Sequence, residues 1–181
     1  GTGTGKTVAI PKLLAHYFGY TSKFFITIPT VKAVLSAAKY GAVCMDVGLG
    51  SEVGYQTGSG GSKTKPWTKL SYCTEKTVQV IINGNPNLEG YDGIILDEFH
   101  LRKLDQDMLL ATVCDIVTRR PEFKVIIMSA TISPEPYEIY FKNKNLKYGL
   151  YTLEGVKGQA KVSWKFADKP TPIMKILSKP L

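Results

Sequence analysis

The first seven residues combine glycines with a lysine and hydroxyl side chains, a composition suited to holding phosphate. They read GTGTGKT, and glycines such as Gly3 and Gly5 let the backbone come close to a ligand. Backbone N–H groups of such a loop point at phosphate oxygens, and the following helix adds its positive N-terminal end. The alternative is a glycine-rich turn before a helix. We predict that Lys6 reaches the terminal phosphates of a nucleotide and the Thr7 hydroxyl binds Mg²⁺, in a site formed by Gly1, Thr2, Gly3, Thr4, Gly5, Lys6 and Thr7.

Two adjacent carboxylates follow an apolar segment in the middle of the chain. The run Ile94-Ile95-Leu96 leads into Asp97-Glu98-Phe99-His100. In α/β folds the ends of buried strands are where ligands bind. Asp97 is therefore expected to hold Mg²⁺, and Glu98 to orient and activate an attacking water as a general base. The alternative is a strand that simply runs into an acidic loop.

A third polar group follows the next apolar segment. Ser129 and Thr131 flank Ala130 directly after the residues KVIIM. We predict that these hydroxyls bond to His100 and sense the terminal phosphate of the nucleotide. The alternative is that they satisfy nearby backbone groups, as hydroxyls at strand ends commonly do.

The elements that must position these residues alternate between strand and helix. Gly41 is expected to end the second helix, and residues 48–68 to form a loop or hairpin with a short strand at 52–56. Continuous apolar strands between helices indicate an α/β fold, with a mostly parallel sheet covered on both faces. A linker is expected at 167–172. The predicted strands are 24–28, 69–73, 93–98, 124–130 and one or two within 148–166; after the opening helix, the predicted helices are 31–40, 74–82, 105–118 and one opening at Ser133-Pro134.

Composition limits the remaining possibilities. The chain has 181 residues, 44% of them hydrophobic, and no apolar run long enough for a membrane helix. The three cysteines, Cys44, Cys73 and Cys114, are widely spaced, which favours reduced thiols over a metal site. The net charge is +8, yet residues 91–123 are net acidic. A basic chain with one acidic segment suits a protein that meets a polyanion on one side and magnesium on another.

Taken together, these motifs resemble those of the DExH helicases, most closely the DEAH-box RNA helicases. The family's DEAHERTLHTD is matched by DEFHLRKLDQD, and its RRPDLKLIVMSATL by RRPEFKVIIMSATI at 119–132. Its LGxxVGY is matched at 49–55, its GKTTQIPQ at 5–12, and its T-D pair by Thr74 and Glu75. The resemblance covers roughly residues 1–155 with the motifs in family order. It also implies that the complete phosphate-binding motif has a further glycine one place before Gly1, so we expect the chain to begin within it.

The resemblance implies a RecA-like P-loop NTPase domain of three layers. Residues 1–155 would form the ATP-binding domain, and 156–181 would connect to a second RecA-like domain in cis. The cofactors would be ATP, or another NTP, with Mg²⁺, and the partner would be single-stranded RNA held by its backbone. We expect an intracellular protein, in cytoplasm or nucleus, and no membrane partner. The implied roles are catalysis for Lys6, Asp97, Glu98 and His100; coupling for His100, Ser129 and Thr131; RNA contact for Pro29, Thr30, Thr74 and Glu75; and stacking on the adenine for Tyr40.

Several positions depart from the family pattern. Thr30 and Val31 stand where the first RNA motif usually has an arginine, Lys76 replaces a glycine, and Phe99 replaces alanine. Lys32, or the basic stretch 63–69 with its tryptophan, is a candidate to compensate. These departures leave open a viral polyprotein-type DExH helicase and a non-catalytic nucleic-acid-binding scaffold. Because the family's arginine fingers lie in the second domain, the 181 residues alone are expected to be nearly inactive.

Overall fold

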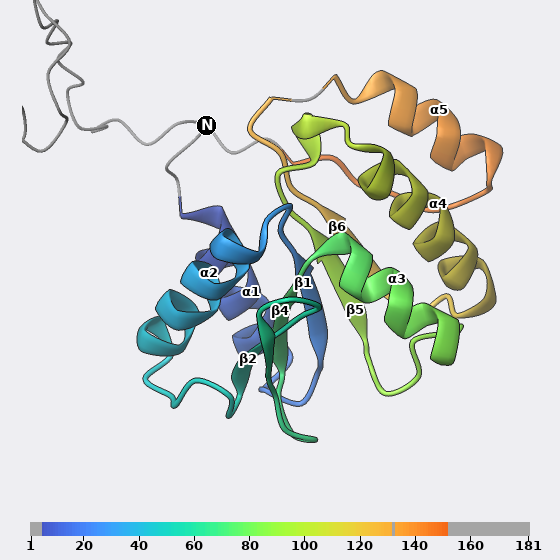
Figure 1. The fold of residues 1–181 in the computed structure, drawn as a ribbon. Helices are drawn as coiled ribbons and strands as arrows, with labels where there is room; N and C mark the ends of the chain where they lie inside the picture. Colours follow the sequence, from blue (N-terminus) through green and yellow to red (C-terminus); the bar gives the residue numbers. More distant parts are fainter. Residues whose placement is uncertain (1–4, 132, 152–181) are drawn as a thin grey trace, which may run out of the picture.

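The computed structural model describes residues 5–131 and 133–151, which form a helix-covered sheet (Figure 1). The described sheet has six strands in the order β3-β2-β4-β1-β5-β6. Every neighbouring pair is parallel except β2 with β3, so the predicted mostly parallel sheet is confirmed. The strands are β1 (Phe24–Thr27), β2 (Val53–Thr57), β3 (Gly61–Lys63), β4 (Leu70–Cys73), β5 (Gly93–Leu96) and β6 (Lys124–Ile127).

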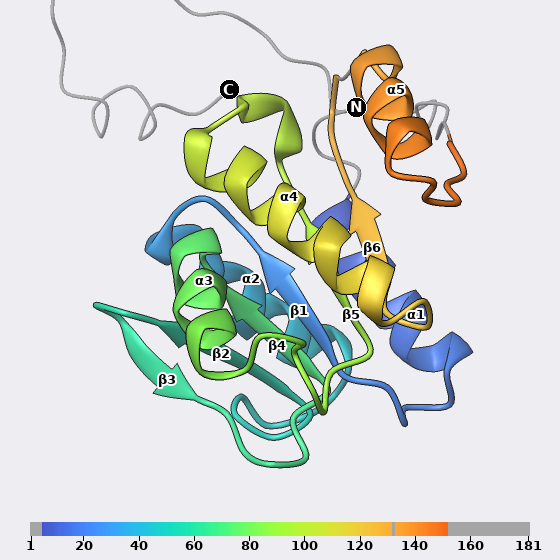
Figure 2. The ribbon, with the colours of Figure 1, turned by 90° about the vertical axis from the view of Figure 1, so that its right-hand side faces the viewer.

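Helices cover both faces of this sheet, which gives the predicted three layers. Figures 1 and 2 show α1 and α2 on one face and α3, α4 and α5 on the other. A short 3₁₀ turn, η1 (Phe99–Leu101), follows β5 and was not expected from the sequence. The helices are α1 (Lys6–Tyr17), α2 (Val31–Cys44), α3 (Glu75–Gly84), α4 (Leu104–Arg119) and α5 (Glu135–Asn143).

Alternation along the buried strands divides the apolar side chains between two cores. Phe24 and Ile26 pack with residues of α1 and α2, whereas Phe25 packs with residues of α3 and α4. All three side chains are fully buried. Phe25 also stacks on Tyr91, with the ring centroids 3.9 Å apart. Since the two helical layers bury both faces, the strands read as continuous apolar runs in the sequence.

The second helix continues past the residue expected to end it. Thr30 caps the N-terminus of α2, with its hydroxyl oxygen accepting the Ala33 N–H at 3.3 Å. The prediction that Gly41 stops the helix is wrong, because α2 runs to Cys44. A Cβ atom at Gly41 would lie 3.2 Å from the hydroxyl oxygen of Tyr72. Glycine is therefore used here for close packing against β4, and not for a helix end.

The sequence predicts either a loop or a hairpin within residues 48–68, and the structure has a hairpin at residues 52–63. Strand β2 pairs with β4 on one side and with the antiparallel β3 on the other. A Cβ atom at Gly54 would lie 2.2 Å from the carbonyl oxygen of Lys63, so only glycine lets the two strands approach this closely.

The later elements agree in part with expectation. The predicted helix after Ser133-Pro134 is present as α5, with Pro134 at its N-cap position. Residues 148–151 lie in no strand. The rest of the predicted strand region, the 167–172 linker and the 155/156 domain boundary fall outside the described residues. Among residues 5–131 and 133–151, no helix is long and apolar enough to cross a membrane.

Candidate functional site

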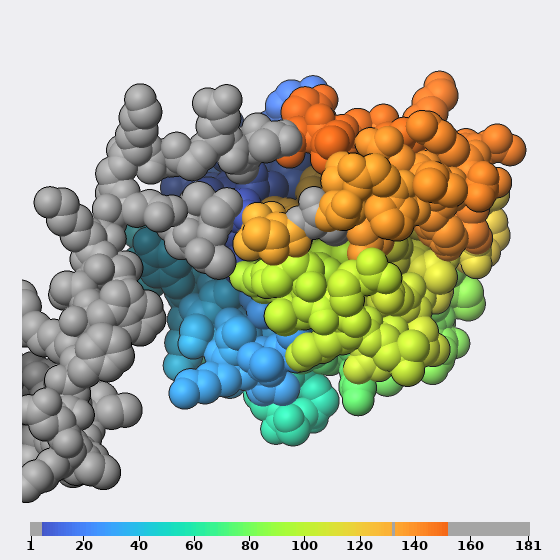
Figure 3. Space-filling view, turned by 90° about the horizontal axis from the view of Figure 1, so that it is seen from above, coloured from blue at the N-terminus to red at the C-terminus, as the bar shows by residue number. Residues whose placement is uncertain are grey.

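The predicted site residues gather at one edge of the sheet. Strands β1, β4, β5 and β6 are parallel, so the segments that follow them emerge at the same edge. Figure 3 looks onto this edge, where the start of α2 (blue), the region around η1 (yellow-green) and the segment after β6 (orange) lie near one another. This topology brings together side chains that are about 100 residues apart in the chain.

The start of α1 contacts the ends of both β5 and β6. Gly5 has a left-handed backbone, with φ of 69°, immediately before the helix begins. The Lys6 ammonium donates a hydrogen bond to the Ser129 carbonyl at 2.9 Å. The Thr7 hydroxyl donates to a carboxylate oxygen of Asp97, a side chain that is buried. Lys6, Thr7 and Asp97 are therefore brought together as predicted, while Gly1, Thr2, Gly3 and Thr4 lie outside the described residues.

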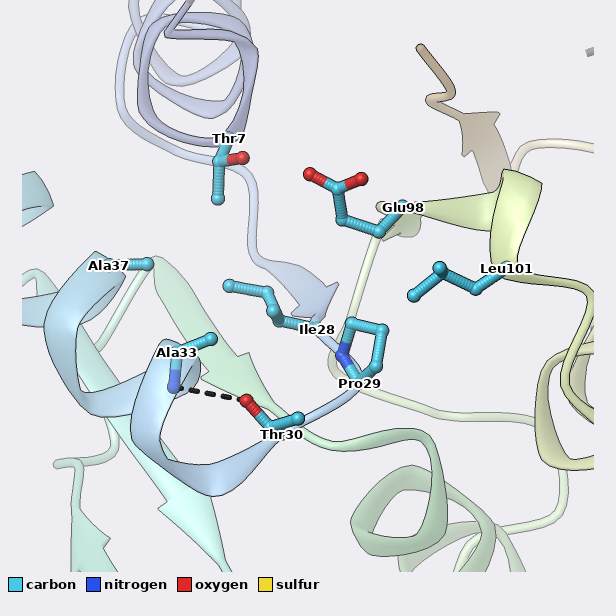
Figure 4. Close-up of a pocket in the computed structure, with 8 residues that line it drawn as sticks. All are labelled: Thr7, Ile28, Pro29, Thr30, Ala33, Ala37, Glu98 and Leu101. Carbon is cyan, nitrogen blue, oxygen red and sulfur yellow. Dashed lines mark hydrogen bonds between the residues drawn. The ribbon is translucent and has the colours of Figure 1, made fainter. Parts of the chain in front are cut away.

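Glu98 occupies the open side of this cluster. Its backbone is left-handed, with φ of 54° and ψ of 36°, and its N–H donates to the other Asp97 carboxylate oxygen at 2.9 Å. The Glu98 side chain remains 44% exposed. Figure 4 shows its carboxylate facing Thr7 across a hollow of about 290 Å³. That hollow is lined by Thr7, Ile28, Pro29, Thr30, Ala33, Ala37, Glu98 and Leu101.

The oxygen atoms at this edge fit a magnesium ion that is shared with a phosphate. Mg²⁺ prefers oxygen ligands, keeps several waters, and binds through one or two protein groups together with substrate phosphates. The contact between the Thr7 hydroxyl and the Asp97 carboxylate supplies two such groups. No cluster of three or more His, Cys, Asp or Glu side chains suited to a metal occurs in the described part of the chain. The donor set thus fits an ion held jointly with a nucleotide better than one held by protein alone.

The coupling residues are near one another, but their predicted hydrogen bond is not present. The Ser129 hydroxyl donates to the Thr131 carbonyl at 3.1 Å, so it satisfies local backbone. His100 places Nε2 3.4 Å from a Glu98 carboxylate oxygen. Its Nδ1 is buried and has no hydrogen-bond partner among the described residues. His100 therefore contacts the candidate general base and not the hydroxyls of Ser129 and Thr131.

The residues expected to contact RNA lie on the same edge, at the starts of α2 and α3. Pro29 and Thr30 line the hollow beside Glu98. Thr74 caps α3, with its hydroxyl oxygen accepting the Thr77 N–H at 3.4 Å. Glu75, however, is only 4% exposed, and burial raises the pKa of its carboxyl. Pro29, Thr30 and Thr74 are thus placed at the surface, whereas Glu75 lies beneath it.

Tyr40 and the basic stretch lie farther from this center. Tyr40 is 62% exposed on α2, three residues along from Ala37 in the hollow. The Lys65 ammonium sits 4.9 Å from the center of the Trp67 ring. This turn leads into the first residue of β4, so it lies at the sheet edge opposite Thr30. The 63–69 stretch is therefore not placed to replace an arginine of the first RNA motif.

Two of the departures from the family pattern have structural explanations. Phe99 is fully buried and packs edge-on against Tyr137 of α5, at 5.6 Å between ring centroids. Lys76, in place of a glycine, pairs with Asp105 at 3.6 Å and so joins α3 to α4. Both changes therefore take part in contacts with a neighbouring helix.

Two supporting residues were missed by sequence reasoning. The Tyr72 hydroxyl donates to the Thr7 carbonyl at 3.1 Å. A signal for it existed, because Pro11 has no N–H to give to the carbonyl four residues earlier. Gln106, which is 1% exposed, contacts the backbone of Asp97 and Glu98. Nothing in the sequence distinguishes this glutamine from an ordinary residue of a helix start.

Comparison with known proteins identifies relatives along most of the chain. No protein-family model matches it. A protein of Acanthamoeba polyphaga mimivirus named as an ATP-dependent RNA helicase is 36% identical over 174 residues, which are 93% of this chain and 24% of that protein. The ATP-dependent RNA helicase HrpA of Borreliella burgdorferi is 36% identical over 143 residues, covering 78% of this chain and 17% of HrpA. The chain thus spans a quarter or less of these relatives, and it belongs to the DEAH/DExH-box RNA helicase family as a RecA-like segment.

Proposed function

We propose that this chain is the nucleotide-hydrolysing RecA-like part of an RNA helicase. One observation carries the proposal: the Thr7 hydroxyl, the buried Asp97 carboxylate and the half-exposed Glu98 carboxylate meet at one sheet edge. A non-catalytic scaffold does not need a carboxylate held beside the magnesium ligands and open to a hollow. The names of the relatives support ATP as the nucleotide and RNA as the nucleic acid.

In the proposed reaction, the chain positions the nucleotide and a water molecule. Lys6 neutralises charge on the terminal phosphates, and the N-terminal end of α1 adds its dipole. Glu98 orients the water and accepts its proton during in-line attack on the γ-phosphate. Mg²⁺ bound near Thr7 and Asp97 would neutralise charge on the β- and γ-phosphate oxygens. Tyr40 is the proposed stacking surface for the base.

RNA is proposed to bind across the starts of α2 and α3. Backbone N–H groups at a helix start attract phosphate, so Pro29, Thr30 and Thr74 would contact the RNA backbone without reading its sequence. Pro29 and Thr30 also line the hollow beside Glu98, which supports a proposal in which the two ligands bind close together. His100, Ser129 and Thr131 are proposed to couple hydrolysis to movement against a second RecA-like domain in cis.

Glu98→Gln tests the catalytic part of the proposal in the full-length protein that carries this sequence. We expect turnover in the presence of RNA to fall by about 10² to 10⁴, the usual contribution of a general base, while nucleotide affinity is retained. Lys6→Ala should weaken nucleotide binding itself. Glu89→Gln is a matched control, because Glu89 is an exposed glutamate in the loop before β5. Turnover in Glu98→Gln equal to that of the control would remove Glu98 from the proposed role.

A further inference from the structure

A buried glutamine lies between the nucleotide residues and the start of α3. Gln106 is in the first turn of α4 and is 1% exposed. Its amide nitrogen donates to a carboxylate oxygen of Glu75 at 3.2 Å and to the Glu98 carbonyl at 3.3 Å. The Asp97 carbonyl is also within 3.5 Å of the same nitrogen. One side chain therefore contacts both the proposed catalytic segment and the proposed RNA-binding segment.

The orientation of this amide follows from its partners. A carboxylate and two carbonyls can only accept hydrogen bonds, so the NH₂ group must face Glu75 and the backbone of residues 97 and 98. The amide oxygen accepts the Lys103 N–H at 3.3 Å. Since both ends of the amide are satisfied in this orientation only, a residue at position 106 that only accepts or only packs would leave the Glu98 carbonyl without this donor.

The contact with Glu98 falls at a strained point of the backbone. Glu98 is left-handed, a conformation that a residue with a side chain adopts only when its surroundings stabilise it. Its carbonyl accepts hydrogen bonds from Gln106 and from the Leu101 N–H, the latter at 3.1 Å. Loss of these bonds would favour a change of Glu98 out of its left-handed conformation, and a change in its φ would move the carboxylate relative to Thr7, so the Gln106 amide helps to set where that carboxylate points.

The contact with Glu75 joins the same amide to α3. Glu75 is the first residue of α3 and follows Thr74, the proposed RNA contact and helix cap. It is buried, so it acts on the RNA site through its packing and not by direct contact. A shift of the start of α3 on RNA binding would therefore displace an acceptor of the amide that also holds the Glu98 backbone.

We infer that Gln106 is a positioning residue that couples RNA binding at the start of α3 to the orientation of Glu98. The inference rests on the proposed function and adds to it a specific connection between its two sites. It predicts that removing the amide reduces the stimulation of ATP hydrolysis by RNA. Binding of the nucleotide should be little affected, because no hydrogen bond joins Gln106 to Lys6 or Thr7 among the described residues.

Other contacts between α3 and α4 offer matched controls. The Gln79 amide donates to the Asp105 carbonyl at 3.2 Å, and so also joins the two helices. No hydrogen bond joins its side chain to residue 97 or 98 in the described part of the chain. Gln79→Leu therefore removes a half-buried interhelical amide of the same type while leaving the Glu98 backbone as it is.

A double variant separates helix packing from the positioning of Glu98. In Glu75→Gln with Gln106→Glu, the new amide at position 75 can donate to the new carboxylate at position 106, and the net charge is unchanged. The helix-to-helix hydrogen bond is kept with its direction reversed. The carboxylate at position 106 has no hydrogen to give to the Glu98 carbonyl, so the positioning contact is lost.

The experiment measures ATP turnover with and without oligouridine RNA, together with the melting temperature, in the full-length protein that carries this sequence. In Gln106→Leu, we expect kcat at saturating RNA to fall about tenfold or more, since small misplacements of catalytic groups have such effects. The KM for ATP and the affinity for oligouridine should stay within about threefold of wild type. The double variant should not regain kcat, and Gln79→Leu should keep kcat.

Two results would overturn this inference but leave the proposed function standing. One is an RNA-stimulated kcat within about threefold of wild type in Gln106→Leu, and the other is full recovery of kcat in the double variant. If Gln106→Leu does not fold, the kcat of the double variant alone tests the inference. A wild-type protein without RNA-stimulated turnover would instead refute the proposed function, and the inference with it.

Discussion

A single hydrogen bond from β4 compensates for a proline inside the first helix. The carbonyl of Thr7 would normally accept the N–H of residue 11, but Pro11 has none. The Tyr72 hydroxyl donates to this carbonyl instead, at 3.1 Å. Gly41 leaves room for it, because a Cβ atom there would lie 3.2 Å from the hydroxyl oxygen. The residue whose hydroxyl contacts Asp97 is therefore supported from the sheet.

Replacing Tyr72 by phenylalanine should leave the Thr7 carbonyl without this partner. An unsatisfied buried acceptor costs about 1 to 3 kcal/mol, and because Thr7 is only partly buried we expect a loss of about 1 kcal/mol in the free energy of unfolding. For a chain of this size, that loss lowers the melting temperature by about 2 to 4 °C. Urea unfolding of the 181-residue chain, followed by circular dichroism, measures it.

Tyr72→Phe made in a Pro11→Ala background tests whether the missing N–H of Pro11 is the reason that the Tyr72 hydroxyl is needed. The alanine introduced there supplies the missing N–H, so Tyr72→Phe should then cost less than about 0.5 kcal/mol, and the double-mutant cycle isolates the difference. Tyr137→Phe is a control, because the Tyr137 hydroxyl is buried with no partner in the described structure and its removal should cost nothing. An equal loss from Tyr72→Phe in both backgrounds would refute the explanation.

Three further predictions concern stability and reactivity. Gly54→Ala should destabilise the β2–β3 hairpin by more than about 1 kcal/mol, seen as a lower urea midpoint, because its Cβ would overlap the backbone of β3. Burial raises the pKa of Glu75 above its usual value near 4.5, so wild type should lose stability as pH rises through the raised value. Glu75→Gln should not show this pH-dependent loss of stability. In urea unfolding it should be more stable than wild type at pH 7 but not at pH 4, and an equal stability difference at both pH values would contradict the prediction. Burial raises the pKa of Cys114 to about 11 and also raises that of Cys73. Both thiols should therefore react with an aromatic disulfide reagent only after unfolding. Fast reaction of either thiol in the native chain would contradict the prediction.

The sequence by itself determined the order of the elements and predicted the chemistry that is proposed for them. Apolar runs that end in Asp97-Glu98 and in Ser129, following Lys6-Thr7, indicate phosphate chemistry at the ends of parallel strands. This works because hydrophobic periodicity and motif spacing are local properties that can be read without knowing which segments touch. The position of Thr7 beside Asp97, separated by 90 residues, followed from that topology and is found in the structure.

Only the tertiary structure decided which side chains support those residues and which are covered. The ends of α2 and the burial of Glu75 depend on what packs against them, since Gly41 faces Tyr72 and Glu75 faces Gln106. Neither contact is encoded in a local pattern. Packing between distant segments can override the usual tendency of glycine to end a helix and of glutamate to remain in water. For the same reason, the connection between the starts of α3 and α4 became visible only in the folded chain.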